Sequence, residues 1–248
     1  MRFLLTILCV ASLFVSHANS VEFSSAEISG APVTVCRVKL KEERLQLFLR
    51  NEAGRPLNSF DGVNQWLSTR GQKLAFAMNA GMFHPGFAPV GLFVNAGAEL
   101  TPLNFSAGAG NFFLKPNGVF AVTPAGACVI ESSQYPKSAP HALLATQSGP
   151  LLVLKGKIHP AFKPGSTFRL FRNGVGVPSP DVALFAITEG PVNLYDFAVF
   201  FRDVLHCPNA LFLDGTLSSL YAPSLHRNDK RADLGPIIGI TQPVSVSP

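Results

Sequence analysis

Short apolar segments bounded by Gly, Pro, Asn or Ser recur along most of the chain, and this pattern predicts a protein built mainly of strands. The predicted strands cover residues 33–40, 45–50, 74–78, 91–94, 112–114, 119–123, 128–130, 151–154, 167–171, 182–188 and 210–213. Residues 123–126 and 155–156 have the composition of hairpin turns. The charged residues 39–44 predict a solvated hairpin between the first two strands.

Two segments repeat apolar residues at helical spacing. In the first, Asn58 is the expected N-cap, Phe60, Val63 and Leu67 share one face, and Gly71 ends the helix. The second is expected to begin at the cap Asn193 and to end at Cys207-Pro208. Its apolar stripe consists of Phe197, Phe200, Phe201, Val204 and Leu205.

Many strands and few helices, without regular alternation, predict an α+β fold with a mixed β-sheet core and a few packed helices. The chain has 248 residues, of which 47% are hydrophobic and 14% charged. This composition can fill a sizeable core and argues against disorder. No internal repeat or linker divides the chain, so a single domain over residues 21–248 is expected.

The first twenty residues have the pattern of a secretory signal peptide. Arg2 supplies a positive start, residues 3–15 are apolar, and small residues at 16–18 or 18–20 offer a cleavage site. We therefore expect a periplasmic or secreted protein. No later apolar run is long enough to cross a bilayer, so no stable membrane span is expected after cleavage. An uncleaved N-terminal anchor is less favoured because the apolar run is short.

Charge and cysteine content narrow the partners only slightly. Removing residues 1–20 takes away Arg2 and no acid, so the net charge falls from +5 to +4. A mild positive excess suits an anionic ligand, while the scattered basic residues do not predict nucleic-acid binding. Cys36, Cys128 and Cys207 remain, and they fit one disulfide as well as they fit buried apolar thiols.

Several predicted strands run into polar residues, and these strand ends are the candidate chemistry. They carry Asn79, Gly81 and His84; Gln147 and Ser148; Arg172 and Asn173; Glu189; and Asp214, Gly215, Ser218 and Ser219. Asp214 and Glu189 could serve as an acid/base pair, His84 could move a proton, and Arg172 could hold a phosphate or carboxylate. A single domain could gather these ends at one sheet edge.

Each of these segments also has a structural interpretation when it is taken alone. Asp214-Gly215 is compatible with an ordinary turn, Gln147 and Ser148 with a polar bulge, and Arg172 with a solvated residue beside an Asn-Gly turn. Glu189 could instead be an acidic residue at a helix N-terminus that interacts favourably with the helix dipole. The chain has no nucleophile elbow, P-loop, zincin motif or zinc-spaced cysteine pair, which removes many hydrolase classes.

Four blocks resemble, in order, the signature blocks of the phosphodiester glycosidase family, which includes the lysosomal uncovering enzyme. They are Asn79-Ala-Gly-Met-Phe83, Gln147-Ser-Gly-Pro150, Arg172-Asn-Gly-Val-Gly176, and Leu213-Asp-Gly215 with Ser218-Ser219. The resemblance covers about residues 30–242 and is greatest to the small exported bacterial branch. It implies an α+β fold, hydrolysis of a sugar-1-phosphodiester, and a substrate surrounded by Asn79, Arg172, Asp214 and the Ser218 region.

The resulting hypothesis is an exported hydrolase that cleaves a sugar-1-phosphodiester in a cell-envelope or exopolysaccharide glycan. Asp214 would be the nucleophile or base, with Glu189 or His84 as its proton partner. No cofactor is expected, although a divalent cation would be compatible with the carboxylates and carbonyls. The alternative is a non-catalytic module that binds envelope glycan or phospho-sugars, because Thr216-Leu217 stands where the family often has glycines. A structural envelope protein is the third alternative.

Overall fold

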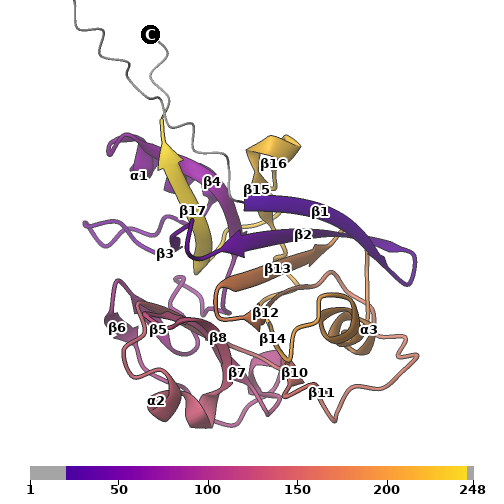
Figure 1. The fold of residues 1–248 in the computed structure, drawn as a ribbon. Helices are drawn as coiled ribbons and strands as arrows, with labels where there is room; N and C mark the ends of the chain where they lie inside the picture. Colours follow the sequence, from indigo (N-terminus) through magenta and orange to yellow (C-terminus); the bar gives the residue numbers. More distant parts are fainter. Residues whose placement is uncertain (1–20, 245–248) are drawn as a thin grey trace, which may run out of the picture.

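The structure is a computed structural model that describes residues 21–244, so the predicted signal peptide, residues 1–20, lies outside the described residues. The described chain forms one sheet-rich domain in which strands take up 42% of the residues and helices 15%. It is therefore predominantly β, and the few packed helices of the α+β prediction are present. In Figure 1, one sheet with α1 lies at the top, a second with α2 at the lower left, and the largest with α3 on the right.

The large sheet has seven strands in the order β1-β2-β13-β12-β14-β10-β11. They are β1 (Val21–Ile28), β2 (Ala31–Lys39), β13 (Val182–Thr188), β12 (Asn173–Ser179), β14 (Asn209–Phe212), β10 (Leu151–Leu154) and β11 (Lys157–Ile158). All seven residues of β13 are buried. Its residues 182–187 are all apolar, as expected for a strand whose two faces are covered by hydrophobic clusters.

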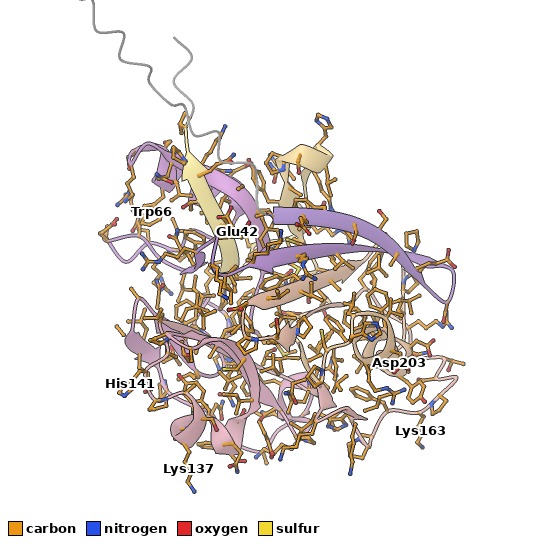
Figure 2. All side chains as sticks on the ribbon, in the orientation of Figure 1. Glu42, Trp66, Lys137, His141, Lys163 and Asp203 are labelled. Atoms are coloured by element: carbon orange, nitrogen blue, oxygen red, sulfur yellow. The ribbon has the colours of Figure 1, made fainter. Side chains whose placement is uncertain are left out.

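Two five-stranded sheets complete the fold. The β4 sheet has the order β16-β15-β4-β17-β3, and the β7 sheet has the order β6-β5-β9-β7-β8. The first contains β3 (Leu45–Phe48), β4 (Gln72–Asn79), β15 (Leu220–Ala222), β16 (Arg227–Asn228) and β17 (Ile237–Pro243). The second contains β5 (Phe93–Asn95), β6 (Ala98–Thr101), β7 (Gly118–Thr123), β8 (Gly126–Glu131) and β9 (Leu144–Ser148). Side chains fill the space between the sheets (Figure 2).

The expected mixed sheet is wrong, because every described strand pair is antiparallel. Parallel pairing needs long crossover connections, usually helical ones, and this chain has few helices. The charged turn at residues 39–44 also does not close a hairpin. Its flanking strands, β2 and β3, pair in different sheets. The turns predicted at residues 123–126 and 155–156 do join the hairpins β7–β8 and β10–β11.

The described helices are short. They are α1 (Phe60–Ser68), α2 (Tyr135–Ser138), α3 (Leu194–Val199), the 3₁₀ turns η1 (Asn111–Phe113), η2 (Ser132–Gln134) and η4 (Pro223–Leu225), and the π-helical turn η3 (Phe200–Val204). The α1 cap is Ser59, whose hydroxyl accepts from the Gly62 amide. The predicted cap Asn58 is wrong because this residue has a φ of 39° and lies in the preceding turn.

The second predicted helix is confirmed at its start. The Asn193 side chain accepts from the Asp196 amide at 2.8 Å and caps α3. Phe197 and Phe201 then pack into the cluster on the large sheet. This contact needs a small residue beneath it, because a Cβ on Gly176 of β12 would lie 2.7 Å from Cδ1 of Phe201. The helix therefore holds β12 and β14 in place.

Two predicted strands are wrong. Residues 112 and 113 lie in η1, and Leu114 is its C-cap. Residues 167–171 contain only an isolated bridge between Leu170 and Val192. Cys36, Cys128 and Cys207 are all free thiols in the structure, so the alternative of buried or partly buried unpaired cysteines is the one found. Among residues 21–244, no helix has the length and apolar character that a membrane crossing requires.

Candidate active site

Strand ends from all three sheets meet at Asp214. Asn79 ends β4, Ser148 ends β9, and Asn173 begins β12. Asp214 follows β14 by two residues, and the Leu213 amide donates to the Asn173 carbonyl at 3.1 Å. The polar ends at Asn79, Ser148, Asn173 and Asp214 therefore meet at the junction of three sheets rather than along one sheet edge.

Two buried asparagines fix the backbone of Asp214. The Asp214 amide donates to Asn173 Oδ1 at 2.9 Å, and the Asp214 carbonyl accepts from Asn79 Nδ2 at 2.9 Å. The asparagines also bond each other, because Asn173 Nδ2 donates to Asn79 Oδ1 at 2.7 Å. Asn79 Oδ1 accepts a further bond from the Ser219 amide at 3.0 Å. Since both side chains are buried, these bonds hold the Asp214 turn in one position.

The Asp214 carboxyl has a perturbed acidity. Burial raises its pKa to about 6, although backbone hydrogen bonds from Thr216 and Leu217 act in the opposite direction. A carboxyl with this pKa is mostly ionised at neutral pH and can still accept a proton readily. Gly215 allows the turn to pass close to its neighbour, because a Cβ there would lie 2.3 Å from the Phe171 carbonyl oxygen.

Arg172 directly precedes β12, whose first residue, Asn173, bonds the Asp214 amide. Arg172 is almost completely buried, with 1% of its surface exposed. Its Nε donates to the Val192 carbonyl at 3.0 Å, but its buried Nη2 has no hydrogen-bond partner among residues 21–244. The rings of Phe168 and Phe212 lie 5.7 and 5.6 Å from the guanidinium carbon. Burial lowers the Arg172 pKa to about 10, so the group still carries its charge at neutral pH.

The predicted serines support the turn through local bonds. Ser148 Oγ donates to the Leu213 carbonyl at 2.6 Å. Ser218 Oγ donates to the Gly215 carbonyl at 2.8 Å, and Ser219 Oγ donates to the Leu217 carbonyl at 2.9 Å. All three hydroxyl protons are therefore used to hold the chain around Asp214, and contact of these residues with a substrate stays a prediction.

The two predicted proton partners have other surroundings. Glu189 accepts from Thr34 Oγ1 at 2.8 Å and forms an ion pair with Arg227, which also pairs with Asp229. His84 is exposed and lies in a turn closed by its own amide and the Ala88 carbonyl. Their roles in proton transfer stay predictions.

Gln147 and Gly81 lie where β9 passes the segment that follows β4. The Gln147 amide bonds Asn104 through both of its ends, at 2.8 Å each, and also bonds the Leu92 amide and the Ser132 hydroxyl. A Cβ on Gly81 would lie 2.6 Å from Thr146 Oγ1. The contacts of these residues are therefore with the protein itself, and substrate binding by either stays a prediction.

Sequence reasoning missed several groups around Arg172. The buried Thr188 hydroxyl accepts from the Arg172 amide at 2.9 Å, and the Phe168 ring covers the guanidinium. Nothing in the local sequence signals either contact, because residues 168 and 188 reach Arg172 through the fold. Residues 21–244 contain no group of three or more His, Cys, Asp or Glu side chains that could hold a metal ion. The expectation that no cofactor is needed, with a divalent cation as a compatible alternative, stays a prediction.

Comparisons with known proteins agree with the four sequence blocks. The family model for phosphodiester glycosidase matches residues 72–241. The uncharacterized protein YigE of Escherichia coli K12 is 30% identical over 214 residues, which are 86% of this chain and 82% of YigE.

Two solved structures share the fold. The catalytic domain of zebrafish N-acetylglucosamine-1-phosphodiester alpha-N-acetylglucosaminidase, auto-inhibited by its pro-peptide, aligns with a TM-score of 0.61 and 16% identity over 91% of this chain and 84% of its own. A hypothetical protein from Synechocystis aligns with a TM-score of 0.57 and 15% identity over 89% of this chain and 61% of its own. Together with the residues matched by the family model, these findings show that the chain belongs to the phosphodiester glycosidase family.

Proposed function

We propose that the protein hydrolyses the glycosidic bond between a sugar and the phosphate of a phosphodiester. The observation that carries this proposal is Asp214, a carboxyl group with a raised pKa whose backbone is held by Asn79 and Asn173. Arg172, a buried arginine with a free N–H, directly precedes Asn173 in the chain. Membership of the phosphodiester glycosidase family supports the reaction class.

Arg172 is the proposed phosphate ligand. A cation buried without an anionic partner is costly, and a phosphate oxygen would supply that partner through a charge-assisted hydrogen bond to Nη2. The same contact would strengthen as negative charge builds up on the departing phosphate, so it would lower the barrier as well as bind the substrate.

Asp214 is the proposed group that acts at the anomeric carbon. It would either attack that carbon directly or remove a proton from an attacking water. The bond between the sugar C1 and the bridging oxygen breaks, and its electron pair leaves with the phosphate. A phosphate oxygen is a weak base, so departure needs no proton from Glu189 or His84. The anomer of the released sugar, followed by NMR, distinguishes attack by Asp214 from attack by water.

The proposed substrate is a phosphodiester-linked glycan of the cell envelope or an exopolysaccharide, outside the cytoplasm. The signal-peptide pattern in residues 1–20 supports export, and a net positive charge suits an anionic polymer. Mass spectrometry of the protein recovered from the periplasm or medium should show a mature N-terminus after residue 18 or 20. An intact N-terminus on cytoplasmic protein would contradict this location.

Turnover by Asp214→Asn tests the proposed reaction. The substrates are p-nitrophenyl diesters of several sugar-1-phosphates, and mass spectrometry should detect free sugar and p-nitrophenyl phosphate. We expect Asp214→Asn to lose on the order of 10³-fold in kcat/KM, because it removes the acting carboxylate. Asp203→Asn is the control, since Asp203 is an exposed carboxylate paired with Arg202.

Unchanged turnover by a folded Asp214→Asn variant would contradict the assignment. Saturable binding of the diesters without product from the unaltered protein would favour the rival proposal of a non-catalytic glycan or phospho-sugar binding module. The side chain of Thr216 is exposed and that of Leu217 packs beside α1, so the turn after Asp214 is bulkier than a glycine loop would be.

A further inference from the structure

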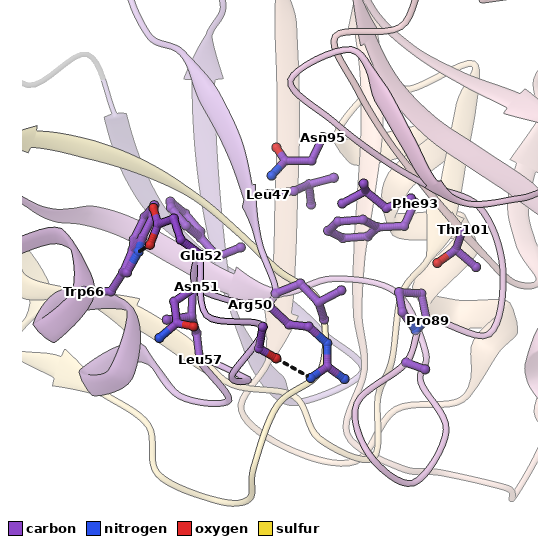
Figure 3. Close-up of a pocket in the computed structure, with 15 residues that line it drawn as sticks. Leu47, Arg50, Asn51, Glu52, Leu57, Trp66, Pro89, Phe93, Asn95 and Thr101 are labelled. Atoms are coloured by element: carbon purple, nitrogen blue, oxygen red, sulfur yellow. Dashed lines mark hydrogen bonds between the residues drawn. The ribbon is translucent and has the colours of Figure 1, made fainter.

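A cavity of about 600 Å³ lies between β3, α1 and the β5–β6 hairpin, and no predicted site residue lines it (Figure 3). We call it the Trp66 cavity; its walls include Leu47, Phe48, Trp66, Phe93, Asn95 and Thr101. The volume is typical of sites that hold a small ligand. A second cavity of about 720 Å³ shares Leu47, Phe48, Trp66 and Asn95, so the hollow continues along the edge strand β3.

Trp66 is held firmly in this wall. Its Nε1 donates to Glu52 Oε2 at 2.9 Å, the Arg70 guanidinium lies 4.1 Å from the ring centroid, and Phe48 packs edge-on at 6.2 Å. In Figure 3, Trp66 and Glu52 lie on one side of the view and Thr101 on the other. An indole fixed in this way offers a rigid apolar surface, because little side-chain entropy remains to be lost on binding.

The charged side chains that line the Trp66 cavity already have partners. Arg50 donates to the carbonyl oxygens of Gly54 and Gly86 at 2.9 and 2.7 Å, and Figure 3 shows the first of these bonds. Glu52 is paired with Arg70 as well as with Trp66. These two are the charged residues among those that line the cavity. A charged ligand would therefore find no free partner of opposite sign in this wall.

Neutral polar groups are left free. The side chains of Asn95 and Thr101 are half-buried and make no hydrogen bond within residues 21–244. The Asn95 amide can donate and accept, as can the Thr101 hydroxyl. Apolar walls, one fixed aromatic ring and a few free neutral donors and acceptors fit a sugar, which has apolar C–H faces and hydroxyls around its rim.

We propose that the Trp66 cavity binds a neutral stretch of a glycan chain. Asn79, Ile237 and Phe48 lie in one row across β4, β17 and β3. Neighbouring strands are ~4.8 Å apart, so the Phe48 wall lies roughly 10 Å from Asn79. This spacing places the cavity near the proposed site. The cavity binds neutral saccharide whether or not Asp214 cleaves a bond, so the proposal does not rest on the proposed function.

The intrinsic fluorescence of the protein tests the proposal directly, because Trp66 is the only tryptophan in the chain. The probes are two neutral tetrasaccharides, one of β-1,4-linked N-acetylglucosamine and one of α-1,4-linked glucose. We expect a saturable change in emission with at least one of them. Asn95→Ala should weaken that binding by ~10-fold, the value of one well-placed hydrogen bond. Asn111→Ala is the matched control, because Asn111 is also half-buried without a side-chain bond and lies outside the cavity.

No saturable change with either tetrasaccharide would overturn the proposal, as would equal binding by the Asn95→Ala variant and the unaltered protein. Thr101→Ala supplies a second variant if Asn95→Ala does not fold, and a melting curve checks both. Asp214→Asn should bind the tetrasaccharide with unchanged affinity. Loss of turnover with retained binding therefore separates the cavity from the proposed reaction, and inorganic phosphate should not compete for it.

Discussion

Replacing Asp214 by Asn should stabilise the folded protein at neutral pH while it removes activity. Burial raises the pKa of the carboxyl from 3.8 to about 6, which means that folding disfavours the charged form. A tenfold change in proton affinity corresponds to about 1.4 kcal/mol, so the charged carboxylate lowers the free energy of unfolding by about 3 kcal/mol. The neutral amide of Asn keeps the shape of the side chain and removes this penalty.

The sign of the pH dependence follows from proton binding. Between pH 4 and pH 6 the folded state holds a proton on Asp214 that the unfolded state has lost. The free energy of unfolding therefore falls as pH rises through this window, and the contribution is constant above it. About 2 kcal/mol of the difference between the unaltered protein and Asp214→Asn should develop between pH 4.5 and pH 8.

Urea unfolding of both proteins across this pH range provides the measurement. Asp61→Asn is the control with the opposite sign, because hydrogen bonds from Lys230 and Asn228 lower the pKa of Asp61. Its loss of stability relative to the unaltered protein should therefore be greater at pH 8 than at low pH. The reasoning about Asp214 is refuted if the two stability curves run parallel, or if Asp214→Asn is less stable than the unaltered protein at pH 8.

Three further variants test the surroundings of Asp214. Phe168→Ala should bind inorganic phosphate roughly two- to fivefold more tightly, because the anion no longer has to displace a ring whose contact with Arg172 contributes about 0.5–1 kcal/mol. Asn173→Ala should lower the free energy of unfolding by about 3 kcal/mol, because it leaves the buried Asp214 amide and Asn79 groups unpaired. Glu189→Gln should lower the melting temperature and reduce kcat/KM by less than ~10-fold, since its main contact is an ion pair.

Matched controls make these outcomes specific. Phe105→Ala removes another exposed ring and should leave phosphate inhibition unchanged. Asn111→Ala is the control for Asn173→Ala and should lower the free energy of unfolding, measured in urea, by less than ~0.5 kcal/mol. Weaker phosphate inhibition of Phe168→Ala, or a loss of turnover in Glu189→Gln as large as that of Asp214→Asn, would contradict the roles given to those residues.

Local sequence signals predicted the elements whose stability depends on local contacts. The cap Asn193 and the apolar run of β13 were both visible, because capping and continuous burial leave a direct mark on the sequence. The strand β12 was missed because its Asn-Gly start is typical of a turn. In the structure Gly174 and Gly176 of β12 lie beneath Phe197 of α3 and Phe201 of η3. These contacts join segments that are far apart in the chain.

The candidate site also combines residues that the sequence reveals with an arrangement that only the folded chain reveals. Asp214, Arg172 and Asn79 were identified from polar residues at strand ends and from the family blocks. Their arrangement depends on three sheets meeting, and no local pattern encodes such a junction. For the same reason, the cover of Phe168 over Arg172 and the ion pair between Glu189 and Arg227 became visible only in the folded chain.

The central claim, cleavage of the bond between sugar and phosphate, is tested most directly by hydrolysis in ¹⁸O-labelled water. A sugar-1-phosphodiester is hydrolysed to completion, and mass spectrometry shows which product carries the label. Attack at the anomeric carbon, as proposed for Asp214, predicts ¹⁸O in the free sugar and none in the phosphomonoester. Label in the phosphate product would show cleavage of the P–O bond and would contradict the account.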